Sequence, residues 1–85
     1  MTPKVYVRFW VVGNFTVVVI RLRNLDGFRL YLKGVAIRNP TDNYRSAIGV
    51  REAVKHALIG VGPGTRVIAW KEALRVARER GLMSS

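Results

Sequence analysis

The sequence predicts an α+β domain, in which a meander of three antiparallel strands is backed by a helix and followed by an additional C-terminal helix. Two patterns lead to this fold class. The first 38 residues contain β-branched and aromatic runs separated by two glycine-containing turns. After residue 40, apolar residues recur at helical spacing. A composition that is 49% hydrophobic is sufficient for one modest core, and 85 residues are too few for two ordinary domains. We therefore expect residues 1–85 to form a single domain.

The sheet is expected over residues 4–38. Lys4 to Val12 alternates in polarity, Gly13-Asn14 supplies a two-residue turn, and Phe15 to Arg23 is rich in Val and Ile. A two-residue loop places Val12 directly opposite Phe15. Counting back along both strands from this pair places Lys4 opposite Arg23.

The second turn is expected at Leu25-Asp26-Gly27, with Gly27 in the left-handed conformation. This three-residue loop pairs Asn24 with Phe28 and Arg23 with Arg29. A two-residue Asp26-Gly27 loop would set Arg23 against Leu30 and mix the two faces of the sheet. Because side chains change face at every step, consistent faces favour the longer loop.

This register divides the sheet into two faces of different character. One face is apolar, must be covered, and carries Val5, Val7, Phe9, Val11, Val18, Ile20, Leu22, Phe28, Leu30 and Leu32. The other interleaves cations with aromatic rings and carries Lys4, Tyr6, Arg8, Trp10, Val17, Val19, Arg21, Arg23, Arg29, Tyr31 and Lys33.

A helix is expected over residues 41–60, capped by Thr41 or Asp42 and ended by Gly60. One side of it forms a lid for the apolar sheet face, with Ala47, Val50, Val54, Ala57 and Leu58. Arg45, Glu52 and His56 lie opposite. Ile48 and Ile59 also lie on the outer side, where they mark a second contact such as a dimer interface.

The C-terminal segment allows two interpretations. After the linker 61–64, spacing favours a helix over residues 65–81, with Val67, Trp70, Leu74 and Ala77 facing inward. The alternative is a short strand over residues 66–70 followed by a helix, which would make the sheet four-stranded.

Charge points to a polyanionic partner. The chain has 15 Lys+Arg against 5 Asp+Glu, a formal net charge of +10. Residues 1–38 carry seven basic and one acidic side chain, or +6, so the excess is concentrated on the strands. A folded domain this basic is typical of nucleic-acid binding. The abundance of charge and the absence of Gln also suggest a hot environment.

Nothing in the sequence favours an enzyme. The five acids are scattered, His56 is alone on a polar helix face, and residues 60–64 lack the ending of a phosphate loop. With no Cys there is no disulfide, thiolate metal site or cysteine nucleophile. We therefore expect no cofactor, metal or small-molecule substrate. No signal or membrane span is visible, which predicts a protein without a membrane partner, cytoplasmic and nucleoid-associated, or nuclear in a eukaryote.

The candidate site is the cationic and aromatic sheet face, with Lys4, Tyr6, Arg8, Trp10, Arg21, Arg23, Arg29, Tyr31 and Lys33. Arg and Lys neutralise phosphates. Tyr6, Trp10 and Tyr31 offer rings on which unpaired bases stack, worth about 1–3 kcal/mol per base. The competing interpretation is that the second helix covers this face, which would leave its buried arginines with too few acids to pair them.

Several motifs occur in an informative order: the run 13–21 ending in Ile20-Arg21, the Asp26-Gly27 turn, Lys33-Gly34-Val35-Ala36-Ile37, then Asn39-Pro40 and Tyr44. Over residues 4–58 the chain resembles the single-stranded-DNA-binding domain of the positive-cofactor-4 (p15) transcriptional coactivators. The resemblance implies a curved sheet backed by a helix, a homodimer, and a basic aromatic groove for single strands or melted duplex.

Within that resemblance, Arg21 matches the family's Arg after Ile, and Lys33 matches its Lys before Gly. The basic residue that follows the turn glycine in the family is Asn14 here, so that contact is not carried over. Three departures stand out: the family's first strand is missing, Arg38 and one further residue lengthen the approach to the helix, and residues 61–85 are additional.

The first hypothesis is a sequence-independent single-stranded nucleic-acid binder that prefers DNA, in a transcription, replication or repair accessory role. The second is a duplex-binding chromatin or architectural protein. The third is a degenerate ribonuclease-H-like interaction domain without activity, prompted by element order and Thr41-Asp42-Asn43 and favoured by a strand over residues 66–70. The fourth is a small ribosomal or viral structural protein.

Overall fold

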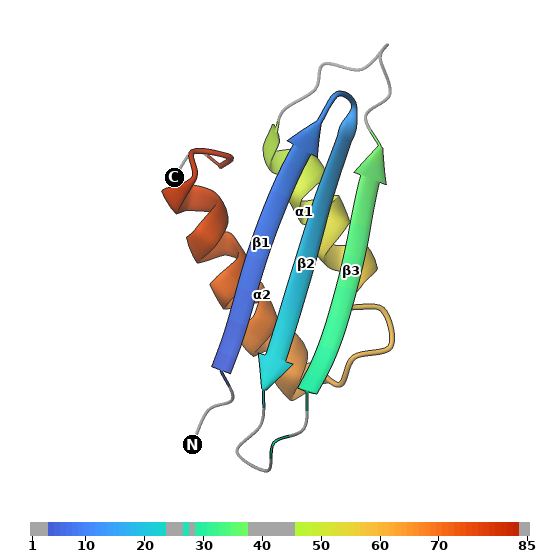
Figure 1. Ribbon diagram of the computed structural model, residues 1–85, viewed down its shortest axis with the longest axis vertical. Helices are drawn as coiled ribbons and strands as arrows, with labels where there is room; N and C mark the ends of the chain where they lie inside the picture. Colours follow the sequence, from blue (N-terminus) through green and yellow to red (C-terminus); the bar gives the residue numbers. More distant parts are fainter. Residues whose placement is uncertain (1–3, 24–26, 28, 38–45, 84–85) are drawn as a thin grey trace.

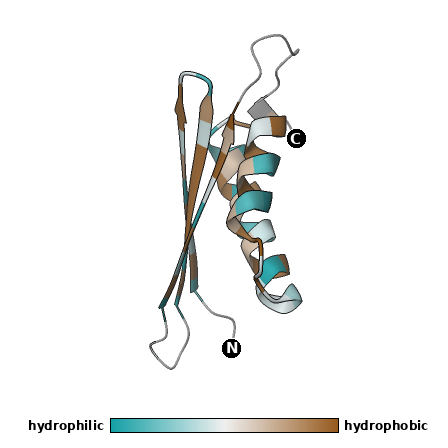
Figure 2. Cartoon of the chain, turned by 90° about the vertical axis from the view of Figure 1, so that its right-hand side faces the viewer, coloured by the Kyte–Doolittle hydropathy of each residue, from teal (hydrophilic) through white to brown (hydrophobic). Residues whose placement is uncertain are grey.

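The computed structural model describes residues 4–23, 27, 29–37 and 46–83. It has the predicted α+β architecture, with elements β1 (Lys4–Val12), β2 (Phe15–Arg23), β3 (Arg29–Ile37), α1 (Ser46–Ala57) and α2 (Pro63–Glu79) (Figure 1). The strands form an antiparallel sheet in the order β1-β2-β3, and both helices lie on the same side of it (Figure 2). Within the described residues, no helix is long and apolar enough to cross a membrane.

The strand register is the one predicted from the two turns. Lys4 lies opposite Arg23, and Arg23 opposite Arg29. Gly13 has φ +56° and Gly27 has φ +81°, the left-handed region that glycine adopts without strain. The rest of the second turn, with the expected Asn24–Phe28 pair, lies outside the described residues. The structure therefore confirms the face assignment of the strands.

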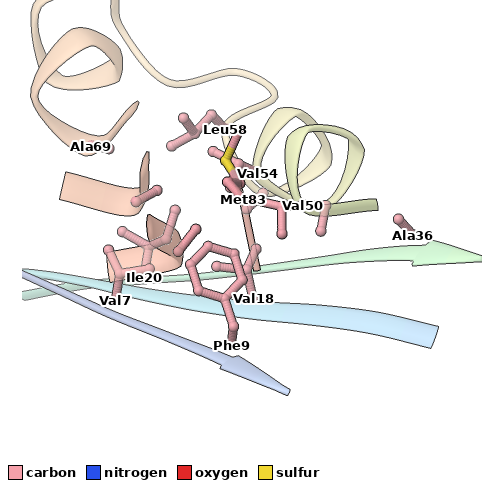
Figure 3. Close-up of a cluster of buried hydrophobic side chains, with 14 of the residues drawn as sticks. Val7, Phe9, Val18, Ile20, Ala36, Val50, Val54, Leu58, Ala69 and Met83 are labelled. Atoms are coloured by element: carbon pink, nitrogen blue, oxygen red, sulfur yellow. The ribbon is translucent and has the colours of Figure 1, made fainter. Parts of the chain in front are cut away.

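The apolar sheet face is covered by the two helices (Figure 3). α1 packs on β2 and β3, and α2 packs on β1. The buried apolar residues are Val7, Phe9, Val18, Ile20, Leu22, Ala36, Val50, Ala53, Val54, Ala57, Leu58, Ala69, Ala73, Ala77 and Met83. Val5, Leu30 and Leu32 pack against this core from its margin. Val11 belongs to the same face but is 47% exposed. The expected core position of Phe28 lies outside the described residues.

α1 follows its predicted pattern. Val50, Val54, Ala57 and Leu58 are buried against the sheet, while Ala47 is half-buried. Gly60, with φ +82°, follows the helix as the expected stop. Ile48 and Ile59 are exposed on the outer side, as are Glu52 and His56. The proposed caps Thr41 and Asp42, with Arg45, lie outside the described residues.

The prediction for α2 was right about the helix and about three of its four inward residues, Trp70, Leu74 and Ala77, and wrong about Val67. Residues 66–70 are helical, so the four-stranded alternative is wrong. Val67, expected to face inward, is 54% exposed, and the fully buried stripe is Ala69, Ala73 and Ala77. Trp70 and Leu74 flank this stripe and are only partly buried. Helical periodicity of large apolar residues misses a helix that packs through small side chains.

Two side chains from the helical layer contact the two edge strands of the sheet, one on each edge. Arg80, directly after α2, donates from Nη1 to the Phe9 carbonyl of β1. His56 of α1 places Nδ1 2.7 Å from the Val35 carbonyl of β3. Because a carbonyl only accepts, Nδ1 carries the proton and Nε2 faces the Glu52 carboxylate at 3.8 Å. His56, which the sequence places alone on the polar face of the helix, thus forms a hydrogen bond with a backbone carbonyl of an edge strand.

Gly34 allows the close approach of α1 to β3. A Cβ added at this position would collide with the Ala53 carbonyl oxygen and would lie 2.6 Å from the Ala57 nitrogen. Both are backbone atoms of the helix, so a larger residue cannot be accommodated by a rotamer change. The helix would have to move away from the sheet.

We expect Gly34→Ala to lower the free energy of unfolding by about 1–3 kcal/mol, the usual cost of overpacking a core. For a domain of this size each 1 kcal/mol corresponds to about 4–8 °C in Tm, measurable by circular dichroism during thermal unfolding. The matched control is Gly64→Ala in the first turn of α2, where an added Cβ meets nothing within 4 Å. There alanine should be neutral or stabilising. Equal Tm values for the two variants would contradict the packing argument.

Candidate nucleic-acid interface

The uncovered face of the sheet consists of five cross-strand rows, each with one residue from each strand. The rows, ordered along the strands, are the charged row (Lys4, Arg23, Arg29), the tyrosine row (Tyr6, Arg21, Tyr31), the mixed row (Arg8, Val19, Lys33), the tryptophan row (Trp10, Val17, Val35) and the tip row (Val12, Phe15, Ile37). The register brings all nine predicted site residues together in the first four rows. We call the first three rows the cationic half and the last two the apolar half.

Exposure decides between the two interpretations of this face. Tyr6 is 48% exposed, Trp10 42% and Tyr31 69%. All the Lys and Arg residues of the cationic half are exposed as well. The interpretation in which α2 covers the face and these rings belong to the core is wrong, because both helices pack on the opposite side (Figure 2).

The cations of this face have no acidic partner among the described residues. The described acids are Glu52, Glu72 and Glu79, all on the helices. Glu52 lies beside the His56 ring, whereas Glu72 and Glu79 form ion pairs with Arg75 and raise the pKa of its guanidinium. Nor do the described residues form a cluster of three or more potential metal ligands. Within the part of the chain that the structure describes, the positive charge of this face is therefore not neutralised by carboxylates.

The cationic half also has local relief. The Arg21 guanidinium carbon lies 5.3 Å from the centre of the Tyr6 ring, within the range of a cation–π contact. This contact holds the long Arg21 side chain against the sheet. A hollow of about 480 Å³ lies at this end, lined by Tyr6, Arg21, Leu22, Arg23, Arg29, Leu30 and Tyr31. It presents arginine side chains and the exposed Tyr31 ring side by side.

The tip row was missing from the predicted site. Val12 is 66% exposed, Phe15 47% and Ile37 71%. They share the face with the cations because the same alternation continues to the last pair of each hairpin. Continuing the predicted register to the ends of the strands would have found them. The predicted site instead stopped at the tryptophan row and omitted Phe15, although this residue is aromatic and lies on the same face.

Comparison with protein-family models, with curated proteins and with solved structures finds no match to this chain.

The charged row should destabilise the domain when no anion is bound, because Arg23 lies directly between Lys4 and Arg29. We expect Arg23→Gln to raise the free energy of unfolding by about 0.2–1 kcal/mol at low salt for each of the two like-charge pairs that it removes. The gain should vanish near 1 M salt, where the Debye length is about 3 Å. Thermal unfolding at the two salt concentrations measures it.

The control for this prediction is Arg78→Gln, which removes a cation from the last turn of α2. A cation at a helix C-terminus is favourable, so this variant should be neutral or slightly less stable. A stabilisation by Arg23→Gln that is unchanged in high salt would show that repulsion is not its cause.

Proposed function

We propose that the protein binds single-stranded nucleic acid, with DNA preferred and without sequence specificity, through the uncovered face of its sheet. The observation that carries the proposal is the face itself: cations without described acidic partners lie beside exposed aromatic rings on a rigid sheet. Cations at this density attract a phosphate backbone. Exposed rings provide the stacking surface that unpaired bases use and paired bases in a duplex do not.

The resemblance to the positive-cofactor-4 family supports the same function and adds a homodimer, for which Ile48 and Ile59 are exposed candidates. A duplex-binding architectural protein remains the second candidate, since the same cations would contact paired strands. The ribonuclease-H-like alternative loses the feature that would have favoured it, because residues 66–70 belong to α2.

The phosphate contribution can be tested by salt dependence. We expect the affinity for a fluorescein-labelled oligothymidylate, measured by anisotropy, to fall linearly with salt on logarithmic axes, with a slope of about −0.7 per phosphate contacted. Lys33→Ala should weaken binding and reduce the slope by about 0.7, because Lys33 lies on the open face. The matched control is Lys71→Ala, which removes an exposed lysine from α2 on the helix side.

Equal effects of the two lysine variants would contradict binding through the sheet. Competition with unlabelled duplex separates the two candidate functions. A duplex that competes as well as the single strand would favour the architectural alternative.

Stacking can be tested with the intrinsic fluorescence of Trp10. In a Trp70→Phe variant Trp10 is the remaining tryptophan, and we expect its emission to be quenched when oligothymidylate binds, because a base lies against its ring. In the reciprocal Trp10→Phe variant the emission of Trp70, which flanks the buried stripe of α2, should not change. Quenching of Trp70 rather than Trp10 would place the nucleic acid on the helix side.

A further inference from the structure

We infer that the bound strand crosses the β-strands in one orientation, with its phosphates on the cationic half and its bases on the apolar half, where Phe15 is the central base contact. This inference rests on the proposed function. It assigns a binding role to Val12, Phe15 and Ile37 and fixes the direction of the strand on the sheet.

The first step is the segregation of the face. The charged, tyrosine and mixed rows contain every cation of the face, whereas the tryptophan and tip rows contain only apolar side chains. Val12, Phe15 and Ile37 are nevertheless 66%, 47% and 71% exposed. Contiguous exposed apolar patches on a folded protein commonly mark interaction sites, whereas single exposed apolar residues do not.

The second step concerns the occupant. A stable protein interface takes about 20–30 residues from each side, and the apolar half offers only two rows of three. A protein partner extending beyond them along the sheet would meet the cations of the mixed row. A nucleotide combines an apolar base face with an anionic phosphate, so it matches both halves at once.

The third step is the direction. A strand lying parallel to the β-strands would place some of its phosphates over the apolar half, where they would lose water without gaining a cation. A strand crossing β1, β2 and β3 places every phosphate on the cationic half and every base on the apolar half, so base stacking involves Trp10 and Phe15 and not the two tyrosines of the cationic half. Both requirements are met only by the crossing orientation.

The two directions also predict different site sizes. Three strands at about 4.8 Å spacing are about 14 Å wide, which leaves room for at most about four nucleotides, because about 3.4 Å per nucleotide is the spacing of a fully stacked strand. Along the strands, nine residues at about 3.4 Å give about 30 Å, which leaves room for at most about nine nucleotides. In a length series of oligothymidylates we therefore expect the affinity to level off at about four nucleotides or fewer, and a further rise towards about nine would indicate the parallel direction.

The central experiment combines protein variants with a base-free ligand. Phe15→Ala should bind an oligothymidylate roughly 5- to 100-fold more weakly than the wild type, the loss of about one stacked base. On an abasic oligonucleotide of equal length, wild type and variant should bind equally, and the salt slope should be the same for both proteins. Ile37→Ala, at the most exposed position of the tip row, should show the same pattern with a smaller loss. Val67→Ala, at an exposed apolar position of α2 on the helix side, is the control and should bind as the wild type on both ligands.

The outcomes separate the two proposals. If the wild type binds neither ligand at low salt, the proposed function is wrong and the inference falls with it. If the wild type binds with the expected salt slope but Phe15→Ala and Ile37→Ala match it on the oligothymidylate, only the orientation is wrong. Equal losses on the abasic ligand would also overturn it. So would a changed oligomeric state of Phe15→Ala in light scattering with unchanged DNA affinity, because the apolar half would then belong to a second copy.

Discussion

The close packing of both helices on one face of the sheet is the constraint on which the rest of the structure depends. A chain of 85 residues builds one core, and here that core lies between the sheet and a single layer of helices. On β3 the approach requires Gly34, because any Cβ would enter the backbone of α1. On α2 the buried stripe is made of alanines. Small residues at these contacts let a three-stranded sheet bury its apolar face completely enough to fold.

That arrangement leaves the other face of the sheet uncovered, and the charge distribution follows from it. The described acids lie on the helices, where Glu52 lies beside the His56 ring and Glu72 and Glu79 pair with Arg75. The strand cations lie on the opposite side without a described acidic partner. Covering them would require burying unpaired guanidinium groups, which is far more costly than leaving them in water. The same distribution makes the face unfavourable for a third protein layer and favourable for a polyanion.

Much of the fold was predictable because short-range signals determine it. Two glycine turns set the register, and a period of two then assigns every strand side chain to a face, so the sequence alone predicts that Lys4, Trp10 and Tyr31 share a face. The inward side of α2 was not predictable in the same way. Val67 and Trp70 have the larger hydrophobicity, but the spacing between helix and sheet selects Ala69 and Ala73. That spacing is a property of the assembled layers and not of the local sequence. The edge contacts of His56 and Arg80 were missed for the same reason, since each joins residues far apart in the chain.

Alternation along the strands also makes stability and binding separable in this protein. Alternate residues of each strand, such as Phe9 on β1 and Val18 and Ile20 on β2, are buried and hold the layers together. Their neighbours project from the same backbone onto the open face and lie outside the buried core. The sheet therefore acts as a rigid frame that fixes the spacing of its exposed rows, while the identity of each exposed side chain is free of packing requirements. Under that freedom, the sorting of cations to one end of the face and apolar side chains to the other is not explained by folding. The proposed binding of nucleic acid would account for it, because a ligand with separate charged and apolar sides gains from the two chemistries only when they lie in separate rows.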